Sequence, residues 1–337
     1  MNDSPTTQLA QPVTDSVVRP RRRVGMWLIV AALLVAIPFI AVAVFFLILV
    51  PMFQPEVDPN LKGPQIEQPS QAATAASKNP EQPELRNCLT DYLYESANQQ
   101  HEHPLDPALH VARQSLNKIR SEIRDYTAQM VKQERIGGKL GEEQFMEIKI
   151  RNPKPDEEIA MAVYLNFLKP ADVAGREVIW VENKNRGRLM AHEGGLKSFM
   201  GGSFNPNGVI AMMGQRYPIT EMGIEILVSR LIEKGERDRA HSECEVEFSR
   251  DIELDGRPCT LITITHPERR DHFDFHIAKV YIDDQLDLPV GYEAYSWPQE
   301  PGGGPMLLEK YFYREIQLNA GLNERDFHPD NPNYNFR

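Results

Sequence analysis

The spacing of apolar side chains divides the chain into four parts. Residues 24–50 are apolar and carry no charged side chain, whereas residues 51–83 are rich in proline and have no apolar period. From residue 84 onward, apolar positions recur with helical and then with strand spacing. The pattern predicts a tail (1–23), a transmembrane signal anchor (24–50), a proline-rich linker (51–83) and one folded domain (84–337).

The anchor prediction depends on length and on flanking charge. About 27 apolar residues form a helix of about 40 Å, which exceeds a bilayer core of about 30 Å. Four arginines between residues 19 and 23 precede the run, and residues 51–60 contain no Lys or Arg. The positive-inside rule therefore places the N-terminus in the cytoplasm and the domain outside it. The run is about twice as long as the apolar region of a cleaved signal peptide, so we expect it to be retained.

Two long segments have helical spacing. An apolar stripe from Leu105 to Ile123 predicts a helix of about five turns, with Asp106 as its N-cap. A second stripe predicts a helix over residues 220–235, with Gly235 as its C-cap. A shorter amphipathic helix is expected near residues 85–93.

The other apolar segments of the domain have a period of two, which is typical of strands. Short turn sequences separate them, so neighbouring strands are expected to pair antiparallel. About ten strands are predicted, over residues 126–136, 143–151, 159–168, 177–182, 188–192, 243–254, 259–265, 273–283, 288–297 and 307–318. With so few helices, the pattern indicates an α+β domain: one curved antiparallel half-barrel sheet with helices packed on its concave face.

The Asp255–Gly256 pair predicts a two-residue hairpin turn. Such a turn pairs Ile252 with Cys259 and leaves Cys244 too distant for a disulfide. A bulge or another register would bring the two cysteines together, so a disulfide between Cys244 and Cys259 remains an alternative.

Composition and charge exclude several classes of protein. The chain has 48 acidic and 37 basic residues and only 3 cysteines, which argues against a nucleic-acid binder and against a disulfide scaffold. The first 50 residues hold four bases and two acids, so the net charge of −11 is +2 there and −13 in the remainder. The sequence contains no P-loop, nucleophile elbow or zinc-protease helix motif. We therefore expect no nucleic-acid partner, no cofactor and no enzyme activity.

His272, Asp274 and His276 form the richest polar group. If a strand begins at Phe273, these three side chains lie on one face and match the donor set of a divalent metal site. A solvent-facing strand with alternating charges produces the same string. We keep a metal site here only as a weak alternative, and with it a metal-dependent hydrolase.

A glycine-rich segment, residues 194–214, interrupts the strands. Its large apolar side chains include Phe199, Met200, Phe204, Met212 and Met213. Mobile backbone with methionine and phenylalanine suits a surface that adapts to an apolar ligand. These residues are therefore candidates for a ligand-binding lid. The alternative is a loop whose apolar side chains fill the core.

Five stretches of the domain carry a recognisable pattern. They are Y-T-A-Q-M-V-K-Q-E-R-I-G-G-K-L at 126–140, G-R-E-V-I-W-V-E-N-K at 175–184, R-Y-P-I-T-E-M-G-I at 216–224, V-Y-I-D-D-Q-L-D-L-P-V-G-Y-E-A-Y-S-W-P at 280–298 and N-P-N-Y-N-F at 331–336. Together they resemble the bacterial family of unknown function DUF1571, over residues 85–337. That family is similar in layout to the LolA-like superfamily of lipoprotein carriers, in which a half-barrel and helices enclose an apolar cavity. The resemblance implies binding of acyl chains or lipoproteins, and it identifies no functional residues.

These predictions combine into one expected function. We expect a single-pass protein of the bacterial inner membrane, with its N-terminus in the cytoplasm and its domain in the periplasm. The domain is expected to bind a lipid, an acyl chain or a lipoprotein in a cavity between sheet and helices, without covalent chemistry. The alternative is a protein-interaction or sensing module of the same fold with a filled cavity.

Overall fold

The computed structural model describes residues 66–67, 88–97, 99, 101–195, 198–241, 243–300 and 302–336. The predicted cytoplasmic tail and the predicted anchor at 24–50 lie outside these residues, as does nearly all of the linker. The chain divides into two compact units, Met1–Met52 and Phe53–Arg337, and every described residue belongs to the second. Among the described residues, no helix is both long and apolar enough to cross a membrane.

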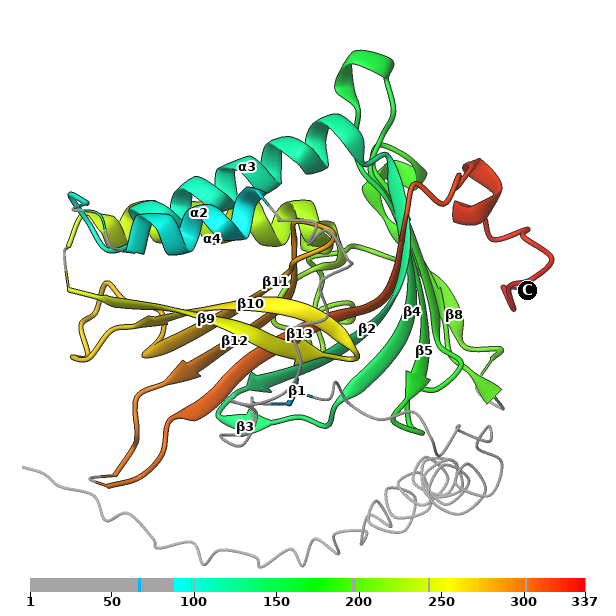
Figure 1. Ribbon diagram of the computed structural model, residues 1–337. Coiled ribbons are helices and arrows are strands. Elements are labelled where there is room, and N and C mark those ends of the chain that lie inside the picture. The colour runs from blue at the N-terminus through cyan, green and yellow to red at the C-terminus, as the bar shows by residue number, and fades with distance from the viewer. Residues whose placement is uncertain are drawn as a thin grey trace, which may run out of the picture. The chain divides into compact units, whose positions relative to one another are not determined.

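The strands of the described residues form one antiparallel sheet that does not close on itself (Figure 1). Its order is β1-β9-β10-β11-β12-β13-β2-β4-β5-β6-β7-β8, and β3 pairs with β2 alone. The strands are β1 Ile66–Glu67, β2 Asp125–Ile136, β3 Lys139–Leu140, β4 Gln144–Arg151, β5 Ala162–Lys169, β6 Glu177–Val181, β7 Leu189–His192, β8 Gly201–Phe204, β9 Glu245–Leu254, β10 Arg257–Thr265, β11 Ile277–Asp283, β12 Leu288–Ser296 and β13 Met306–Leu318. Because β2 pairs with β13, residues from the two ends of the domain meet in the middle of the sheet.

The predicted antiparallel sheet is confirmed, with thirteen strands in place of about ten. The three additional strands, β1, β3 and β8, are only two to four residues long. β8 lies within the glycine-rich segment, where no apolar alternation indicates a strand. β5 and β11 begin later than predicted, because the residues before each of them form turns and loops.

The three α-helices of the described residues lie on one face of the sheet, which bends around them (Figure 1). They are α2 Cys88–Ala97, α3 Asp106–Glu122 and α4 Ile224–Arg239. Short 3-10 helices occupy the connections: η3 Pro155–Glu157, η4 Asn185–Gly187, η6 Ile219–Glu221 and η7 Glu324–Phe327.

Helix α4 differs from its prediction at both ends. Gly235 is not a C-cap, since the helix continues to Arg239. A Cβ atom at Gly235 would lie 2.8 Å from Cδ2 of Leu109, so this glycine allows α4 to pass close to α3. The helix begins after Gly223, whose φ of 116° favours glycine.

Asp106 is the first residue of α3, and the N-cap position belongs to Leu105. The Asp106 carboxylate nevertheless accepts a hydrogen bond from the backbone N–H of His103 at 3.0 Å. It also pairs with Arg239 at 2.6 Å. Asp106 therefore connects the start of α3 to the end of α4.

The main core lies between the helices and the concave face of the sheet. Its fully buried side chains include Leu93 of α2, Met146 of β4 and Val228 of α4. The buried hydroxyl of Tyr126, on β2, accepts a hydrogen bond from the backbone N–H of Ile224 at 2.8 Å. This contact holds the start of α4 against the sheet.

The opposite face of β5 and β6 is covered by residues 322–336, the C-terminal strap. The ring of Tyr334 stacks on Tyr164 with 4.0 Å between centroids. The backbone N–H of Asn335 donates to Glu177 at 2.7 Å. The N-P-N-Y-N-F ending is therefore part of the folded domain.

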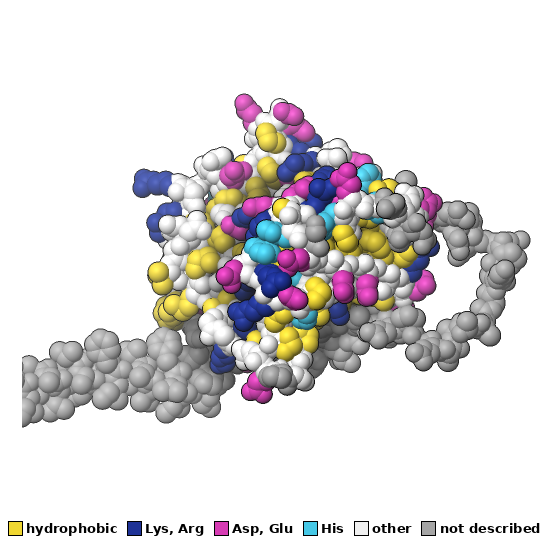
Figure 2. Space-filling view, turned by 90° about the vertical axis from the view of Figure 1, so that its left-hand side faces the viewer, with side chains coloured by type: hydrophobic (Ala, Val, Ile, Leu, Met, Phe, Trp, Pro, Cys, Tyr) yellow, Lys and Arg dark blue, Asp and Glu magenta, His cyan; other side chains and the backbone are white. Residues whose placement is uncertain are grey.

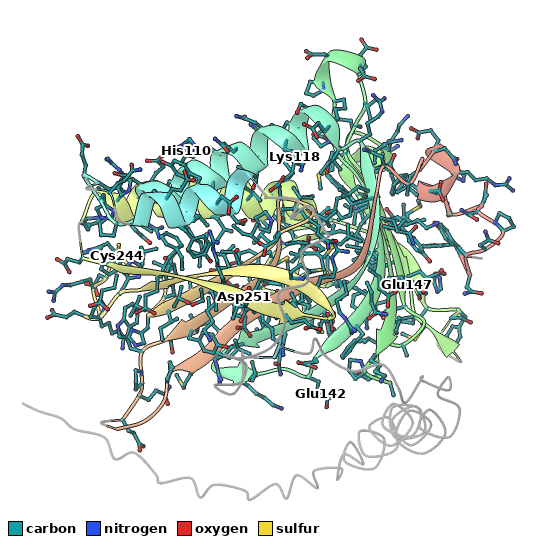
Figure 3. The ribbon with its side chains drawn as sticks, in the orientation of Figure 1. His110, Lys118, Glu142, Glu147, Cys244 and Asp251 are labelled. Carbon is teal, nitrogen blue, oxygen red and sulfur yellow. The ribbon has the colours of Figure 1, made fainter. Side chains whose placement is uncertain are left out.

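The hairpin of β9 and β10 has the predicted register, with Ile252 opposite Cys259. Asp255 and Gly256 have φ values of 53° and 76°, as a type I′ turn requires. Cys244 lies just before β9 (Figure 3), and it and Cys259 are free cysteines. The alternative of a disulfide between them is therefore wrong.

Candidate functional site

Two of the cavities in the described part of the chain adjoin each other on the concave face of the sheet. The loop cavity has a volume of about 590 Å³ and lies between strands β5–β7 and residues 199–219. The helix cavity has a volume of about 550 Å³ and lies between α4 and strands β2, β12 and β13. Both volumes are in the range of about 300–1,000 Å³ that holds small-molecule ligands. Lys132, Tyr217 and Met222 line both cavities, which therefore adjoin.

The loop cavity is lined mainly by apolar side chains. The sheet contributes Leu165, Phe167, Val178, Leu189 and Ala191, and the covering segment contributes Phe199, Met200, Phe204, Pro206, Ile210, Ala211, Met213 and Ile219. Four of the five candidate lid residues are among them, and the fifth, Met212, is not. The structure thus places most of the predicted apolar segment over a cavity, and its ligand-binding role stays a prediction.

Large apolar side chains of this segment are also exposed to solvent. Phe199 is 77% exposed, Ile210 66% and Met213 72%. Val209 is 84% exposed. Contiguous exposed apolar surface on a soluble domain commonly marks a binding site. Val209 and Ile210 were not predicted, although two adjacent β-branched residues beside a glycine in a loop are a usable signal.

Two glycines of the segment are required for close packing. A Cβ atom at Gly194 would lie 2.1 Å from the carbonyl oxygen of Ala174. A Cβ atom at Gly201 would lie 3.0 Å from the carbonyl oxygen of Ala191. Because these positions hold the backbone close to the β5–β6 turn and to β7, glycine content alone does not establish mobility. The motion of a lid stays a prediction.

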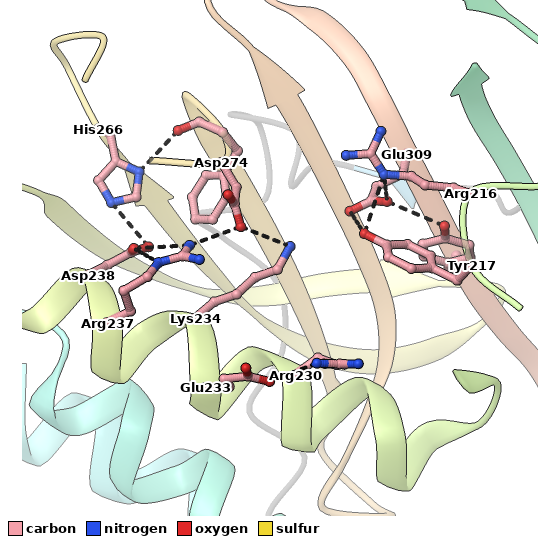
Figure 4. A network of polar contacts seen from close by, with 12 residues as sticks. Arg216, Tyr217, Arg230, Glu233, Lys234, Arg237, Asp238, His266, Asp274 and Glu309 are labelled. Atoms are coloured by element: carbon pink, nitrogen blue, oxygen red, sulfur yellow. Dashed lines mark hydrogen bonds and ion pairs between the residues drawn. The ribbon is translucent and has the colours of Figure 1, made fainter. Parts of the chain in front are cut away.

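A polar cluster, with Arg216 and Tyr217 partly exposed and its other members buried, lies where the two cavities adjoin. It consists of Lys132, Glu134, Arg216, Tyr217, Glu309 and Tyr311, three of which are labelled in Figure 4. Glu134 and Glu309 lie directly opposite each other on β2 and β13. Nε of Arg216 is 2.7 Å from Oε2 of Glu309, and the Arg216 backbone N–H donates to Glu134 at 2.9 Å.

The remaining members complete the pairing of the two carboxylates. The Tyr311 hydroxyl donates to Oε1 of Glu134 at 2.6 Å, and the Tyr217 hydroxyl donates to Oε1 of Glu309 at 3.3 Å. Nζ of Lys132 lies 3.5 Å from Oε2 of Glu134. Two acids and two bases therefore balance within the cluster.

Burial determines how these groups hold their protons. Burial raises the pKa of Glu309, and the charge of Arg216 opposes this. Burial lowers the pKa of Lys132, and Glu134 opposes this. Burial also raises the pKa of Tyr217 to about 12, so its hydroxyl remains a hydrogen-bond donor.

Sequence reasoning missed this cluster. Its signal is charged or polar residues at alternate positions of two predicted strands: 132 and 134 in one, 309 and 311 in the other. The pattern indicates one shared face in each strand. It does not show that the two strands are neighbours, because they are far apart in the chain.

A second network ties α4 to the loop before β11 (Figure 4). Asp274 pairs with Arg237 at 2.9 Å and with Lys234 at 3.6 Å. Nε2 of the fully buried His266 is 3.6 Å from Oδ2 of Asp238. Burial lowers the pKa of His266 to about 4, which keeps the ring neutral near neutral pH.

His272, Asp274 and His276 do not share a strand face, because β11 begins only after His276. His272 stacks on His241 at 3.7 Å between ring centroids, while Nδ1 of His276 lies 2.8 Å from the carbonyl oxygen of His266. Figure 2 shows this end of the molecule, where histidine side chains lie among acidic and basic ones. Within the described part of the chain, no three His, Cys, Asp or Glu side chains are grouped to hold a metal ion.

The family model described as "Protein of unknown function (DUF1571)" matches residues 123–336, which include both cavities and the C-terminal strap. The chain belongs to the DUF1571 family. The resemblance seen in the sequence is thereby confirmed. No curated protein matches this DUF1571 chain.

Several solved structures are similar to the DUF1571 domain in outline. A putative outer membrane lipoprotein-sorting protein domain from Vibrio parahaemolyticus is 15% identical, covering 65% of this chain and 95% of that chain with a TM-score of 0.32. The lipoprotein LppX from Mycobacterium tuberculosis is 15% identical, covering 65% and 98% with a TM-score of 0.31. A LolA superfamily protein from Nitrosomonas europaea is 9% identical, covering 66% and 97% with a TM-score of 0.24. The sequence identities and TM-scores are low, so we infer no ligand from this likeness.

Proposed function

We propose that this domain binds the apolar chain of a lipid or of a lipidated protein in the loop cavity, without covalent chemistry. The observation that carries the proposal is the combination of a cavity of about 590 Å³ with exposed Phe199, Ile210 and Met213 in its lining. An apolar chain entering the cavity removes both its own surface and these side chains from water. Each methylene buried contributes about 0.8 kcal/mol, so a chain of about 16 carbons yields on the order of 10 kcal/mol before ordering costs.

The proposal includes the place where the domain works. Residues 24–50 hold it on the periplasmic side of the bacterial inner membrane, with the N-terminus in the cytoplasm. Protease added to spheroplasts, but not to intact cells, should remove the domain. Digestion of the domain only after cell lysis would place it in the cytoplasm.

An alkyl probe carrying a diazirine tests the ligand-binding role. The full chain, held soluble in amphipol, is irradiated with the probe, and labelled peptides are identified by mass spectrometry. Labelling is expected in residues 199–213 and on β5–β7. Replacing Phe199, Met200 and Met213 with serine together should reduce labelling by at least about tenfold, because the apolar lining is lost.

Ile136→Ser is the matched control for this experiment. Ile136 is also an exposed large apolar residue, at 38%, but it lies at the end of β2 and does not line the loop cavity. Its replacement should leave labelling unchanged. Equal labelling of the triple variant and the wild type would show that the loop cavity does not bind the alkyl chain.

The alternative is docking of a partner protein onto the same exposed side chains, with the cavity playing no part. In that case the probe would label only the outer surface of residues 199–213, and the strands β5–β7 beneath them would stay unlabelled.

A further inference from the structure

The helix cavity contains a buried hydroxyl group without a hydrogen-bond partner. Tyr292, on β12, is only 3% exposed and lines this cavity. Its hydroxyl finds no partner among the described residues. Buried polar groups are nearly always hydrogen-bonded, so this hydroxyl is a position at which a ligand atom or a water would complete the bonding.

The position of this hydroxyl is fixed by the sheet. Tyr292 lies opposite Tyr311 in the β12–β13 pairing. The two rings are nearly parallel, with an angle of 3° and 6.5 Å between centroids. Tyr311 is already engaged with Glu134, so the Tyr292 hydroxyl is the member of this pair that remains available.

The charged groups around the cavity are already paired with one another. Within the polar cluster, Arg216 pairs with Glu309 and Lys132 with Glu134. At the edge of the cavity, Glu221 pairs with Arg230 at 3.1 Å, and Lys234 pairs with Asp274 at 3.6 Å.

A ligand with a net charge would have to break one of these pairs in a partly buried site, where an uncompensated charge is unfavourable. An uncharged polar group needs only the free hydroxyl. The helix cavity therefore favours a neutral hydrogen-bonding group over an anion or a cation.

Such a group can be the end of the chain that occupies the loop cavity. Lys132, Tyr217 and Met222 line both cavities, so a single ligand can extend from one into the other. The helix cavity also offers apolar contacts from Ile226 and Leu227 of α4. A ligand that fills both cavities is thus an amphiphile.

We propose that the helix cavity binds the uncharged polar end of this amphiphile, with the Tyr292 hydroxyl hydrogen-bonded to an ester or amide carbonyl. This inference rests on the proposed function, in which the apolar chain lies in the loop cavity. An uncharged acyl ester occurs in a glyceride, and an uncharged acyl amide occurs in a lipid-modified peptide. The shared chemistry is an acyl carbonyl without a neighbouring charge.

Competition against the diazirine alkyl probe tests the inference on the full chain in amphipol. The competitors carry the same dodecanoyl chain: monolauroyl glycerol, an N-lauroyl peptide amide and laurate. Both uncharged competitors, or the one that matches the natural source, should displace the probe at a lower concentration than laurate does. One net hydrogen bond corresponds to a preference of about 3- to 10-fold. Tyr292→Phe should abolish this preference while leaving direct labelling by the alkyl probe intact.

Tyr281→Phe is the matched control, because Tyr281 is equally buried, donates to Glu293 and does not line either cavity. It should keep the preference. Laurate displacing the probe as well as the uncharged competitors would overturn the inference, and so would an unchanged preference in Tyr292→Phe. Both results leave chain binding standing if the probe still labels the loop cavity. If the probe does not label the loop cavity of the wild type, both the proposed function and this inference are wrong.

Discussion

Glu134 and Glu309 lie directly opposite each other on β2 and β13, at 6% and 2% exposure, and Arg216 contacts both. Like charges at directly opposed positions destabilise a sheet unless a cation lies between them. The segment that covers the loop cavity leads directly into Arg216. The polar cluster therefore attaches this segment to the middle of the sheet.

Arg216→Met should destabilise the domain by about 3 kcal/mol, because the buried carboxylate of Glu309 loses its paired cation. Chemical denaturation of the variant measures the loss. Adding Glu309→Gln should recover part of the loss, since the uncompensated charge is then removed. Arg230→Met is the control: Arg230 is half exposed and pairs with Glu221 and Glu233, so a loss below about 1 kcal/mol is expected. Equal losses in the two arginine variants would show that the cluster has no special role.

The C-terminal strap should be held most strongly within a limited pH range. Nε2 of His192 lies 2.6 Å from Oε2 of Glu177, to which Asn335 also donates. Burial alone raises the pKa of Glu177, but hydrogen bonds from His192 and Tyr164 lower it overall. Burial alone lowers the pKa of His192, but the hydrogen bond to Glu177 raises it overall.

These two shifts define the range. The Glu177 contribution is present above its unfolded pKa and is lost as the pH falls through its lowered folded pKa. The His192 contribution is present below its unfolded pKa and is lost as the pH rises through its raised folded pKa. The difference in thermal midpoint between wild type and Glu177→Gln should therefore peak between those two folded pKa values. A difference that is constant with pH would contradict the assignment. Glu157→Gln, at a half-exposed pair with Arg124, should show no peak.

Gly194→Ala should destabilise the domain by about 1–3 kcal/mol, because the added Cβ would meet the backbone of Ala174 and Gly175. Gly202→Ala is the matched control in the same segment. There the nearest atom to an added Cβ is 3.4 Å away, in the ring of Phe204. Thermal unfolding of both variants checks this. Similar stability of the two would mean that the segment is looser than its contacts indicate.

The sequence predicted those parts of the fold that depend on local pattern. The Asp255–Gly256 turn determines the pairing of Ile252 with Cys259, because a two-residue turn leaves one register. Helix ends were less predictable. Glycine is the residue typical of a C-cap, yet Gly235 lies within α4, where it allows close contact with Leu109 of another helix.

The candidate site was predicted only in its apolar half. Phe199, Met200, Phe204 and Met213 stand out in a glycine-rich segment, and the structure places them in the lining of one cavity. The polar half requires the pairing of β2 with β13, between residues about 175 positions apart. Such long-range pairing has no local signal in a single sequence. Tyr292 is likewise an ordinary strand residue until the structure shows its hydroxyl without a partner.

Native mass spectrometry of the full chain, released from amphipol after purification from membranes, tests the central claim most directly. The account predicts a second species that is heavier than the protein by the mass of one acyl-containing molecule. That species should be lost in the variant with serine at positions 199, 200 and 213 and retained in Ile136→Ser. A wild-type spectrum showing only the mass of the protein, under conditions that preserve non-covalent complexes, would contradict binding of an apolar chain.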